Sequence, residues 1–531
     1  MRKLLKLLIV SSLFFTCGTS KKQSQQDTSN STSTTETNAN SPEVYANTIT
    51  ADELKDMLFT YASDDFEGRD TGEQGQKKAI EYLRQQYLDM GVAAPLEGGE
   101  NYFQEVPLVK QKTAIANVVI NGEEYKAFED QIVIMINESI DMNTEDIVYV
   151  GYGIDSENYS DYKDIDVRGK VVLAKAGEPK DESGNYVTTG TTEKSKWTEG
   201  RQAISSKRDA ALEKGAAVFI YAENSLFKRY APYLERLARN GTNRNLSLVN
   251  NKESMLMIMS NSVLAEAIYP DIYDDDKSKK IESSIVIKAE NQSEIIQSEN
   301  VLAYIEGSEK PDELVVISAH LDHVGITDGE VYNGADDDGS GTVAVVEIAE
   351  AFKTAVLEGH TPKRSILFLH VTGEERGLLG SRYYTDIDPI FPLSNTVANL
   401  NIDMIGRTDP KRTEGNRNYV YLIGSDKLST ELHELSEEVN NKYCNVELDY
   451  KYNDENDPNR FYYRSDHYNF AKNNVPVIFY FNGTHADYHQ PSDTPDKIEY
   501  DLLENRARLV FHTAWELANR EKRITVDKAV E

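Results

Sequence analysis

The chain has 531 residues, of which 57 are Lys or Arg and 89 are Asp or Glu, so its formal net charge is −32. With 39% hydrophobic residues, this composition excludes collagen-like, low-complexity and polytopic membrane proteins. The acidic balance and the lack of a dense Lys/Arg run argue against nucleic acid as a partner. Because single cores stop growing at roughly 250 to 300 residues, we expect two or more domains.

The first 18 residues have the pattern of an export signal. Three cations among the first six residues precede the apolar run Leu7–Phe15, which is too short to span a bilayer. The stretch from Leu13 to Gly18 resembles the lipobox of bacterial lipoproteins, although Phe15 and Thr16 stand where small residues are commonest. The resemblance implies a signal peptide at 1–16, a lipid anchor at Cys17, and a location in the cell envelope outside the cytoplasm. The alternative is an ordinary cleaved signal peptide.

Residues 17–47 are predicted to be a disordered tether. Small polar and charged side chains dominate this stretch, so it has too little apolar surface to order itself.

After the tether, the pattern of predicted helices and strands changes along the chain. Apolar residues at helical spacing predict helices near 54–61 and 79–87, in a first part that we place at 48–140. Strands at 147–154, 170–174 and 217–221, with a helix at 209–214, predict a smaller α/β module at 141–290. From there to residue 523, apolar strands alternate with helical stretches, which indicates parallel βαβ units, and 524–531 is a C-terminal tail.

Four strands of the last region end in residues that carry chemistry. The strands at 314–318, 365–369, 397–402 and 475–480 are followed by His320, by Glu374 with Glu375, by Asp403 and by His489. Since ligands bind at the carboxyl ends of strands in open α/β sheets, we expect these side chains to share one rim.

An acidic loop bounded by glycines, Gly334–Gly341, leads into a predicted helix at 343–352. Taken singly, each of these features has an ordinary interpretation: a hydrogen-bonded surface pair, a first-turn dipole match or a simple turn. Because all of these features occur together, a metal site becomes the better interpretation: two His and three carboxylates suit two divalent metals.

The same motifs carry a family resemblance that covers nearly the whole chain after the tether. The segments His320–Asp322, Gly334–Gly341, Gly373–Glu375, Asn401–Met404 and Tyr488–His489 resemble, in the same order, those of the di-zinc exopeptidases that include bacterial leucyl aminopeptidases and glutamate carboxypeptidase II. Residues 66–72 resemble the segment near the start of that peptidase domain. Residues 141–290 resemble the protease-associated domain that is often inserted in the family.

The resemblance implies a three-layer α/β/α zinc exopeptidase domain with a mixed, largely parallel sheet, plus the inserted smaller α/β domain. It also implies two zinc ions per chain, bridged by Asp337. His320 and Asp403 would complete one site, and Glu375 and His489 the other. A cis peptide bond is implied between Asp337 and Asp338.

Three further residues receive catalytic roles from the resemblance. Glu374 would be the general base, Asp322 would orient His320 through its carboxylate, and Tyr488 would donate a hydrogen bond to the carbonyl oxygen under attack.

We therefore expect a metallo-exopeptidase, and specifically an aminopeptidase, that hydrolyses N-terminal residues from peptides with a water activated by two zinc ions. The alternatives are a carboxypeptidase of the glutamate carboxypeptidase type, a glutaminyl cyclase-like acyl transferase and an inactive, receptor-like binding protein. The preferred side chain of the substrate and the formation of a homodimer stay open. The role of the insert, as a lid, a substrate-sizing wall or a dimer surface, stays open as well. Residues 460–467 are a candidate for substrate contacts, with a solvated loop as the alternative.

Overall fold

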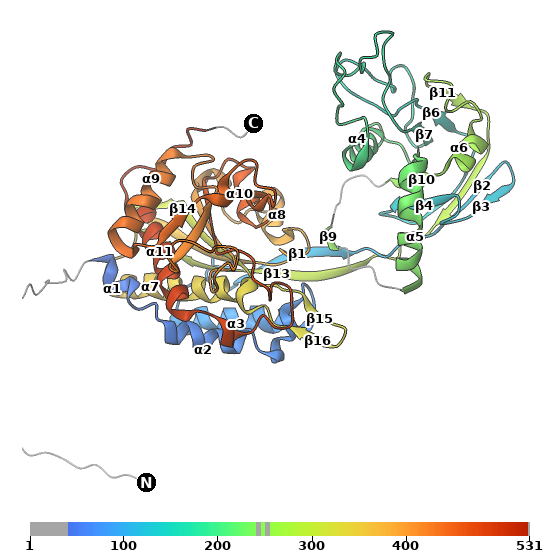
Figure 1. Ribbon diagram of the computed structural model, residues 1–531. Helices are drawn as coiled ribbons and strands as arrows, with labels where there is room; N and C mark the ends of the chain where they lie inside the picture. Colours follow the sequence, from blue (N-terminus) through green and yellow to red (C-terminus); the bar gives the residue numbers. More distant parts are fainter. Residues whose placement is uncertain (1–40, 241–245, 250–254, 529–531) are drawn as a thin grey trace, which may run out of the picture. The chain divides into compact units, whose positions relative to one another are not determined.

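The computed structural model describes residues 41–240, 246–249 and 255–528 (Figure 1). The predicted signal peptide, residues 17–40 of the predicted tether, including Cys17, and residues 529–531 of the predicted tail lie outside these ranges. Among the described residues, no helix is long and apolar enough to cross a membrane.

A nine-stranded sheet forms the centre of the peptidase part. β14 pairs in parallel with β17 and β18, and β18 with β21, whereas β13, β1 and β9 extend one side of the sheet with antiparallel pairs. The sheet is therefore mixed, with a parallel centre, as predicted. In spatial order its strands are β20 (Glu447–Asp449), β19 (Tyr419–Ile423), β21 (Val477–Phe481), β18 (Thr396–Ile402), β14 (Lys310–His320), β17 (Arg364–Val371), β13 (Glu294–Ile305), β1 (Phe103–Lys110) and β9 (Leu246–Leu248).

Helices cover both faces of this sheet, which confirms the three-layer α/β/α fold. Val315 and Ile317 of β14 pack toward one helical layer, while Leu314 and Val316 pack toward the other. Because both faces are buried, the strand has a continuous apolar run instead of an alternating pattern. The first layer contains α1 (Pro42–Ala46), α2 (Ala51–Tyr61), α3 (Gln74–Met90), α7 (Gly341–Leu357), α9 (Thr430–Val439) and α11 (Tyr500–Asn519). The second contains α10 (His467–Ala471) and the helical segment Tyr383–Ile387, beside α8 (Leu379–Arg382).

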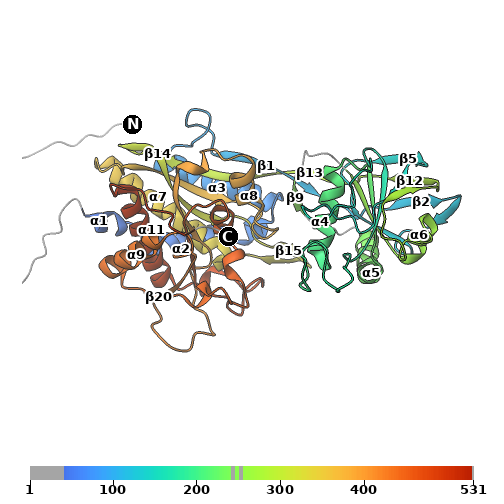
Figure 2. The ribbon, with the colours of Figure 1, turned by 90° about the horizontal axis from the view of Figure 1, so that it is seen from above.

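The insert has two sheets of its own (Figure 2). The six-stranded sheet runs in the order β11 (Lys279–Ile281), β6 (Ile147–Tyr149), β7 (Val171–Lys175), β8 (Val218–Ala222), β10 (Leu256–Ser260) and β4 (Gln131–Met135). The four-stranded sheet runs in the order β3 (Glu123–Tyr125), β2 (Ala116–Ile120), β12 (Ile285–Ala289) and β5 (Ile140–Thr144). One face of the larger sheet packs on α4 (Gly200–Glu213) and α5 (Asn224–Asn240), and the other on α6 (Ser262–Ile268) and the smaller sheet.

The strand pairing moves the first boundary of the insert. Strands β2 to β4 lie before residue 140 and were expected in the peptidase part, yet β2 pairs with β12 and β4 with β10. The insert therefore begins in the loop between β1 and β2. Conversely, β9 lies within 141–290 but pairs with β1 of the large sheet. These pairings join segments more than 100 residues apart, which local sequence patterns do not encode.

The folded body also begins earlier than residue 48. α1 lies within the predicted tether, and Tyr45 is fully buried there. The Tyr45 hydroxyl donates to Glu358 at 3.0 Å, and its ring stacks on Trp515. At the other end, Ile524 of the predicted tail is buried as well. Short apolar anchors such as these are easily overlooked in polar surroundings.

Candidate metal and active site

The site lies where the parallel strands of the large sheet end. His320 is the last residue of β14, Asp403 follows β18 directly, and Glu374 and Glu375 follow β17. His489 comes from the loop after β21, and Asp337 lies in the turn between β14 and α7. Because these four strands run in the same direction, their carboxyl ends share one edge.

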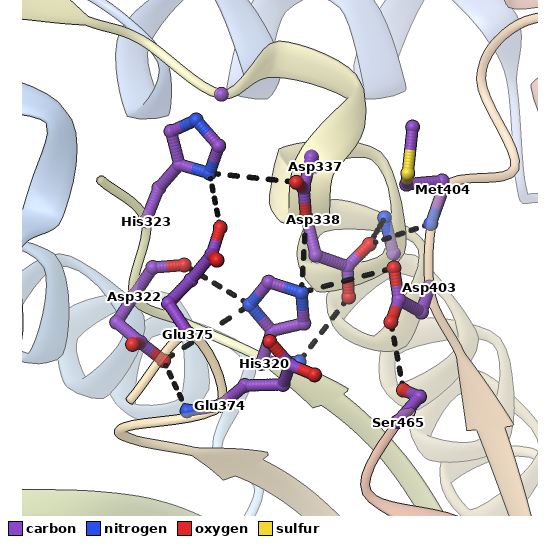
Figure 3. A network of polar contacts seen from close by, with 12 residues as sticks. His320, Asp322, His323, Asp337, Asp338, Glu374, Glu375, Asp403, Met404 and Ser465 are labelled. Carbon is purple, nitrogen blue, oxygen red and sulfur yellow. Dashed lines mark hydrogen bonds and ion pairs between the residues drawn. The ribbon is translucent and has the colours of Figure 1, made fainter. Parts of the chain in front are cut away.

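One group of three donors gathers around His320. Its Nε2 atom lies 3.2 Å from Asp337 Oδ1 and 3.7 Å from Asp403 Oδ1, and the three side chains point toward one another in Figure 3. A hydrogen bond from the Ser465 hydroxyl to Asp403 Oδ2, at 2.7 Å, fixes the outer oxygen of that carboxylate. The inner oxygen is left for a cation.

A second group gathers around Glu375. His489 Nε2 lies 3.1 Å from Glu375 Oε1 and 3.0 Å from Asp337 Oδ2. Asp337 therefore presents Oδ1 to the first group and Oδ2 to the second. This is the arrangement in which one carboxylate serves two ions, and it brings the five predicted ligands together.

The two neighbours of Asp337 point elsewhere. Asp338 accepts hydrogen bonds from the backbone amides of His320, Gly341 and Met404, so it ties the metal-site turns together. Asp336 accepts from the Ser340 hydroxyl and the Gly406 amide. The peptide bond between Asp337 and Asp338 is cis, as the resemblance implied.

The donor atoms fit metal ions. Within the described part of the chain, buried atoms without a hydrogen-bond partner include His320 Nε2, Asp337 Oδ2, Glu375 Oε1 and His489 Nε2. Buried polar atoms are rarely left unpaired, so a set that converges on two points indicates cations that complete it. Among the described residues, two groups of three could hold an ion: His320, Asp337 and Asp403, and His323, Asp337 and Glu375.

The electrostatics of the site favour positive charge. Burial alone would lower the pKa of His320, but the carboxylates of Asp337 and Asp403 outweigh it and hold that pKa well above its usual range. In the same way, Asp337 and Glu375 raise the pKa of His489 to about 10 against the effect of burial. Divalent cations can take the place of the protons that these carboxylates attract.

Glu374 lies beside the donor groups but contributes no donor atom to either of them. Burial raises the pKa of its carboxyl well above the usual range, and the charges of Glu375 and Asp403 add to this effect. Its backbone amide donates a hydrogen bond to Asp322 Oδ1 at 3.1 Å, which fixes the turn that carries it.

The position of Asp322 differs from the expected one. The His320 Nδ1 atom lies 3.0 Å from the backbone carbonyl oxygen of Asp322 and 4.0 Å from its carboxylate. The carboxylate instead accepts hydrogen bonds from the Thr71 hydroxyl and the Glu374 amide. The chain turns immediately after β14, and this turn brings the carbonyl, not the side chain, against the imidazole.

A small cavity opens beside Asp337, Glu374 and Asp403. Tyr488 lines it and stacks on His489, with ring centroids 3.9 Å apart. The remaining wall is largely apolar, with Arg464 as its one cation: it is formed by Met404, Phe461, Arg464, Phe479, Phe481 and Thr484. Arg464 comes from the segment 460–467 that was a candidate for substrate contacts.

The segment 66–72 holds two turns of the site in place. The Arg69 guanidinium is buried and donates to the carbonyl oxygens of Leu321, Asn333 and Gly334 at 2.7 to 3.1 Å. These carbonyls belong to the turn after His320 and to the start of the acidic loop. Arg69 therefore joins the segments that carry His320 and Asp337.

Sequence reasoning missed His323. Its Nδ1 atom lies 3.0 Å from Glu375 Oε1 and 3.8 Å from Asp337 Oδ2 (Figure 3). The available signal was its position in the same turn after β14, three residues beyond His320. Ser465 lies in the candidate segment 460–467, but its hydrogen bond to the metal-site carboxylate of Asp403 was not foreseen.

Comparison with known proteins agrees with this geometry. Residues 300–514 match the model of peptidase family M28. A "Probable zinc metalloprotease" of Pyrenophora teres f. teres is 28% identical over 279 residues, which cover 44% of this chain and 54% of that protein. "Aminopeptidase YwaD" of Bacillus subtilis is 26% identical over 293 residues, which cover 52% of this chain and 57% of that protein. The chain thus spans about half the length of these curated relatives.

Among solved structures, an aminopeptidase from Aneurinibacillus sp. strain AM-1 aligns with a TM-score of 0.47 at 17% identity, covering 92% of this chain and 99% of that one. The segment matched by the family model supplies all five predicted ligands and Glu374. Residues 300–514 therefore resemble peptidase family M28 both in their sequence and in the residues of their site.

Proposed function

We propose that the chain is a zinc-dependent metallo-exopeptidase, and specifically an aminopeptidase. The observation that carries this proposal is the Asp337 carboxylate, whose two oxygens face two separate donor groups while Glu374 lies beside them. The names of the relatives support it, since aminopeptidases and zinc metalloproteases are prominent among them.

The residues divide the chemistry of hydrolysis between them. Zinc ions held by the donor groups would lower the pKa of a bound water and polarise the scissile carbonyl. Glu374 would accept the proton of that water and pass it to the leaving amine. Its carboxyl lines the cavity beside Asp337 and Asp403, where it can take and release that proton. The Tyr488 hydroxyl would donate a hydrogen bond to the carbonyl oxygen as negative charge develops there.

The cavity points to the kind of residue that is removed. Met404 and three phenylalanines line it next to Glu374 and Asp403. An apolar side chain at the substrate's N-terminus would exclude water from this wall, and each buried methylene contributes about 0.8 kcal/mol. We therefore expect apolar N-terminal residues to be preferred over charged ones.

A substrate panel tests the activity and its polarity. Aminoacyl substrates with apolar, acidic and basic residues are compared with N-blocked peptides that have a free carboxyl terminus, each with and without a chelator. The proposal expects chelator-sensitive release from apolar aminoacyl substrates. Cleavage of only the N-blocked peptides would identify a carboxypeptidase, and release that persists after full metal removal would contradict metal-dependent hydrolysis.

We also propose that the protein reaches the cell envelope through a lipid anchor at Cys17. The sequence around Cys17 and the polar stretch that follows it support this proposal. Metabolic labelling with a fatty acid should give an acylated protein that fractionates with membranes, and Cys17→Ser should remove the label. An unacylated, soluble wild type would contradict the anchor.

The insert is proposed to be a protease-associated domain. Strands β6 and β7 and helix α4 occupy the segments that carry the sequence resemblance. An experimental structure whose insert superposes on domains of that kind would support the proposal, and a different strand order would overturn it.

A further inference from the structure

His323 is fully buried beside the second donor group, although it is not one of the five expected ligands. Its Nδ1 atom and Glu375 Oε1 are 3.0 Å apart, yet neither atom has a hydrogen-bond partner. Two donor atoms this close without a hydrogen bond are directed at a common point instead of at each other.

The distances around that point match a tetrahedral zinc site. With metal to ligand distances of about 2.0 to 2.1 Å, neighbouring ligand atoms of a tetrahedral ion lie about 3.3 to 3.4 Å apart. Asp337 Oδ2 and Glu375 Oε1 lie 3.0 and 3.1 Å from His489 Nε2, and 3.8 and 3.0 Å from His323 Nδ1. Four of the six edges of one coordination shell thus lie close to the spacing that a tetrahedral ion requires.

The fold makes a specific place for the His323 ring. Gly334, with φ of +55°, lies against it, and a Cβ atom at that position would come within 2.4 Å of His323 Cγ. On another side, the ring meets the His489 ring at an angle of 71°, with centroids 5.6 Å apart. The imidazole is therefore held in position before any ion binds.

We propose that His323 is a fourth protein ligand of the ion held by Asp337, Glu375 and His489. This inference rests on the proposed two-zinc function and deepens it. The ion at this site then has a closed shell of four protein donors, as structural zinc sites do. The group of His320, Asp337 and Asp403 offers three donors and keeps an open position next to Glu374 and the cavity. The two ions are consequently unequal: one is held tightly, and the other faces the substrate.

The competing interpretation makes His323 a residue that supports Glu375 without touching the metal. Loss of such supporting residues typically costs roughly 10- to 100-fold in metal affinity. Loss of a direct ligand should cost more than this and should change the coordination of the ion itself. These two consequences separate the interpretations.

The experiment measures zinc and cobalt binding by the full chain and by His323→Ala, His323→Gln and His512→Gln. His512 is a buried histidine on α11, where it stacks on Tyr443 outside both donor groups, so it controls for the loss of a buried imidazole. His323→Gln supplies a side-chain amide that can hydrogen-bond to Glu375 but is a poor zinc ligand. Far-UV circular dichroism identifies the variants that are folded.

Wild type and His512→Gln should each retain one zinc ion at chelator concentrations that remove the other. Both His323 variants should lose the tight ion, with affinity lowered by more than about 100-fold, and cobalt at that site should lose its intense four-coordinate absorption. If the folded variants keep the tight ion or the cobalt spectrum of the wild type, His323 is not a ligand. A wild type that binds two zinc ions and cleaves peptides would leave the proposed function standing in that case. A wild type that binds no zinc would overturn both proposals.

Discussion

Glu374 and Glu375 are neighbours in the chain, but their side chains lie in opposite electrostatic environments. Burial and nearby carboxylates raise the pKa of Glu374 well above its usual range. Although burial and Asp337 oppose it, the contacts of Glu375 with His323 and His489 lower its pKa to about 2. One carboxyl is therefore suited to carry a proton, and the other is suited to stay ionised as a ligand.

The first prediction uses this pair. Glu374→Gln should retain two zinc ions and lose about 10²- to 10⁴-fold in kcat, because an amide cannot accept the proton of the attacking water. Glu375→Gln should lose zinc as well as turnover. Elemental analysis and steady-state kinetics on both variants provide the test. Near wild-type turnover in Glu374→Gln would show that Glu374 is not the general base.

The second prediction concerns Asp322. Its carboxylate accepts hydrogen bonds from the Thr71 hydroxyl and the Glu374 amide, while its backbone carbonyl oxygen contacts the His320 ring. Asp322→Ala should therefore keep both zinc ions but reduce kcat by about 10- to 100-fold, since the turn that carries Glu374 loses its anchor. Thr71→Val removes only one of the two hydrogen bonds and should reduce kcat less. Loss of zinc from Asp322→Ala would show instead that the carboxylate orients His320.

Much of the site could be predicted because its residues directly follow apolar strands. His320, Glu375 and Asp403 are marked by the strand that ends before each of them, and the apolar pattern that predicts each strand lies within one short window of the sequence. The role of the Asp322 carbonyl could not be predicted in this way. It depends on the dihedral angles of a single turn, and backbone atoms have no signature in the sequence. His323 was overlooked for a related reason, because a second histidine in a turn can point in any direction.

At the scale of elements, the helical turn Asp64–Arg69 connects the first layer of helices to the metal site. The Arg69 guanidinium donates three hydrogen bonds to the turns that carry His320 and Asp337. It also donates a hydrogen bond to the carbonyl oxygen of Tyr61, at the end of α2. A lysine cannot replace this planar fork, because its single ammonium reaches fewer carbonyls at once.

The third prediction follows from this clamp. Arg69→Lys should lower zinc affinity by about 10- to 100-fold and lower the Tm. Arg364 is a matched control: it is also buried and donates to the carbonyls of Leu517 and Arg520, but it lies at the first residue of β17, at the other end of the strand from the site. Arg364→Lys should lower the Tm without a change in zinc affinity. Equal zinc affinity in the two variants would contradict the positioning role of Arg69.

The elements also show where prediction from the sequence fails. The helices α2 and α3 and the strands β14, β17 and β18 lie where the apolar patterns placed them, because each pattern is contained in one short window. The start of the insert was misplaced because β2 and β4 are defined by partners far along the chain. Strand pairing of this kind is a property of the whole fold.

Glu347 links the stability of the folded protein to pH. It is buried on α7, and burial, with the charges of Glu53 and Glu350, raises its pKa to about 8. In the unfolded chain a glutamate titrates near its ordinary pKa of about 4.3. Its contribution to stability is therefore complete below that pH and is lost as the pH rises through about 8, because the folded state must then bury a charge.

The fourth prediction is that Glu347→Gln stabilises the protein at high pH. Its free energy of unfolding should be close to that of the wild type near pH 4.5 and should exceed it by about 2 kcal/mol or more near pH 9. Glu81→Gln, at an exposed position on α3, should show no such difference. Denaturant unfolding at several pH values provides the measurement, and parallel pH profiles for wild type and Glu347→Gln would contradict the assignment.

In the proposed site Asp337 bridges two zinc ions that the activity requires, so the number of bound ions is the decisive measurement. The full chain is stripped with a chelator, titrated with zinc, and followed by elemental analysis and by release from an apolar aminoacyl substrate in parallel. We expect two zinc ions per chain, activity that returns as they bind, and loss of both ions in Asp337→Asn. A chain that saturates at one zinc ion with full activity, or an Asp337→Asn variant that keeps two, would contradict this expectation.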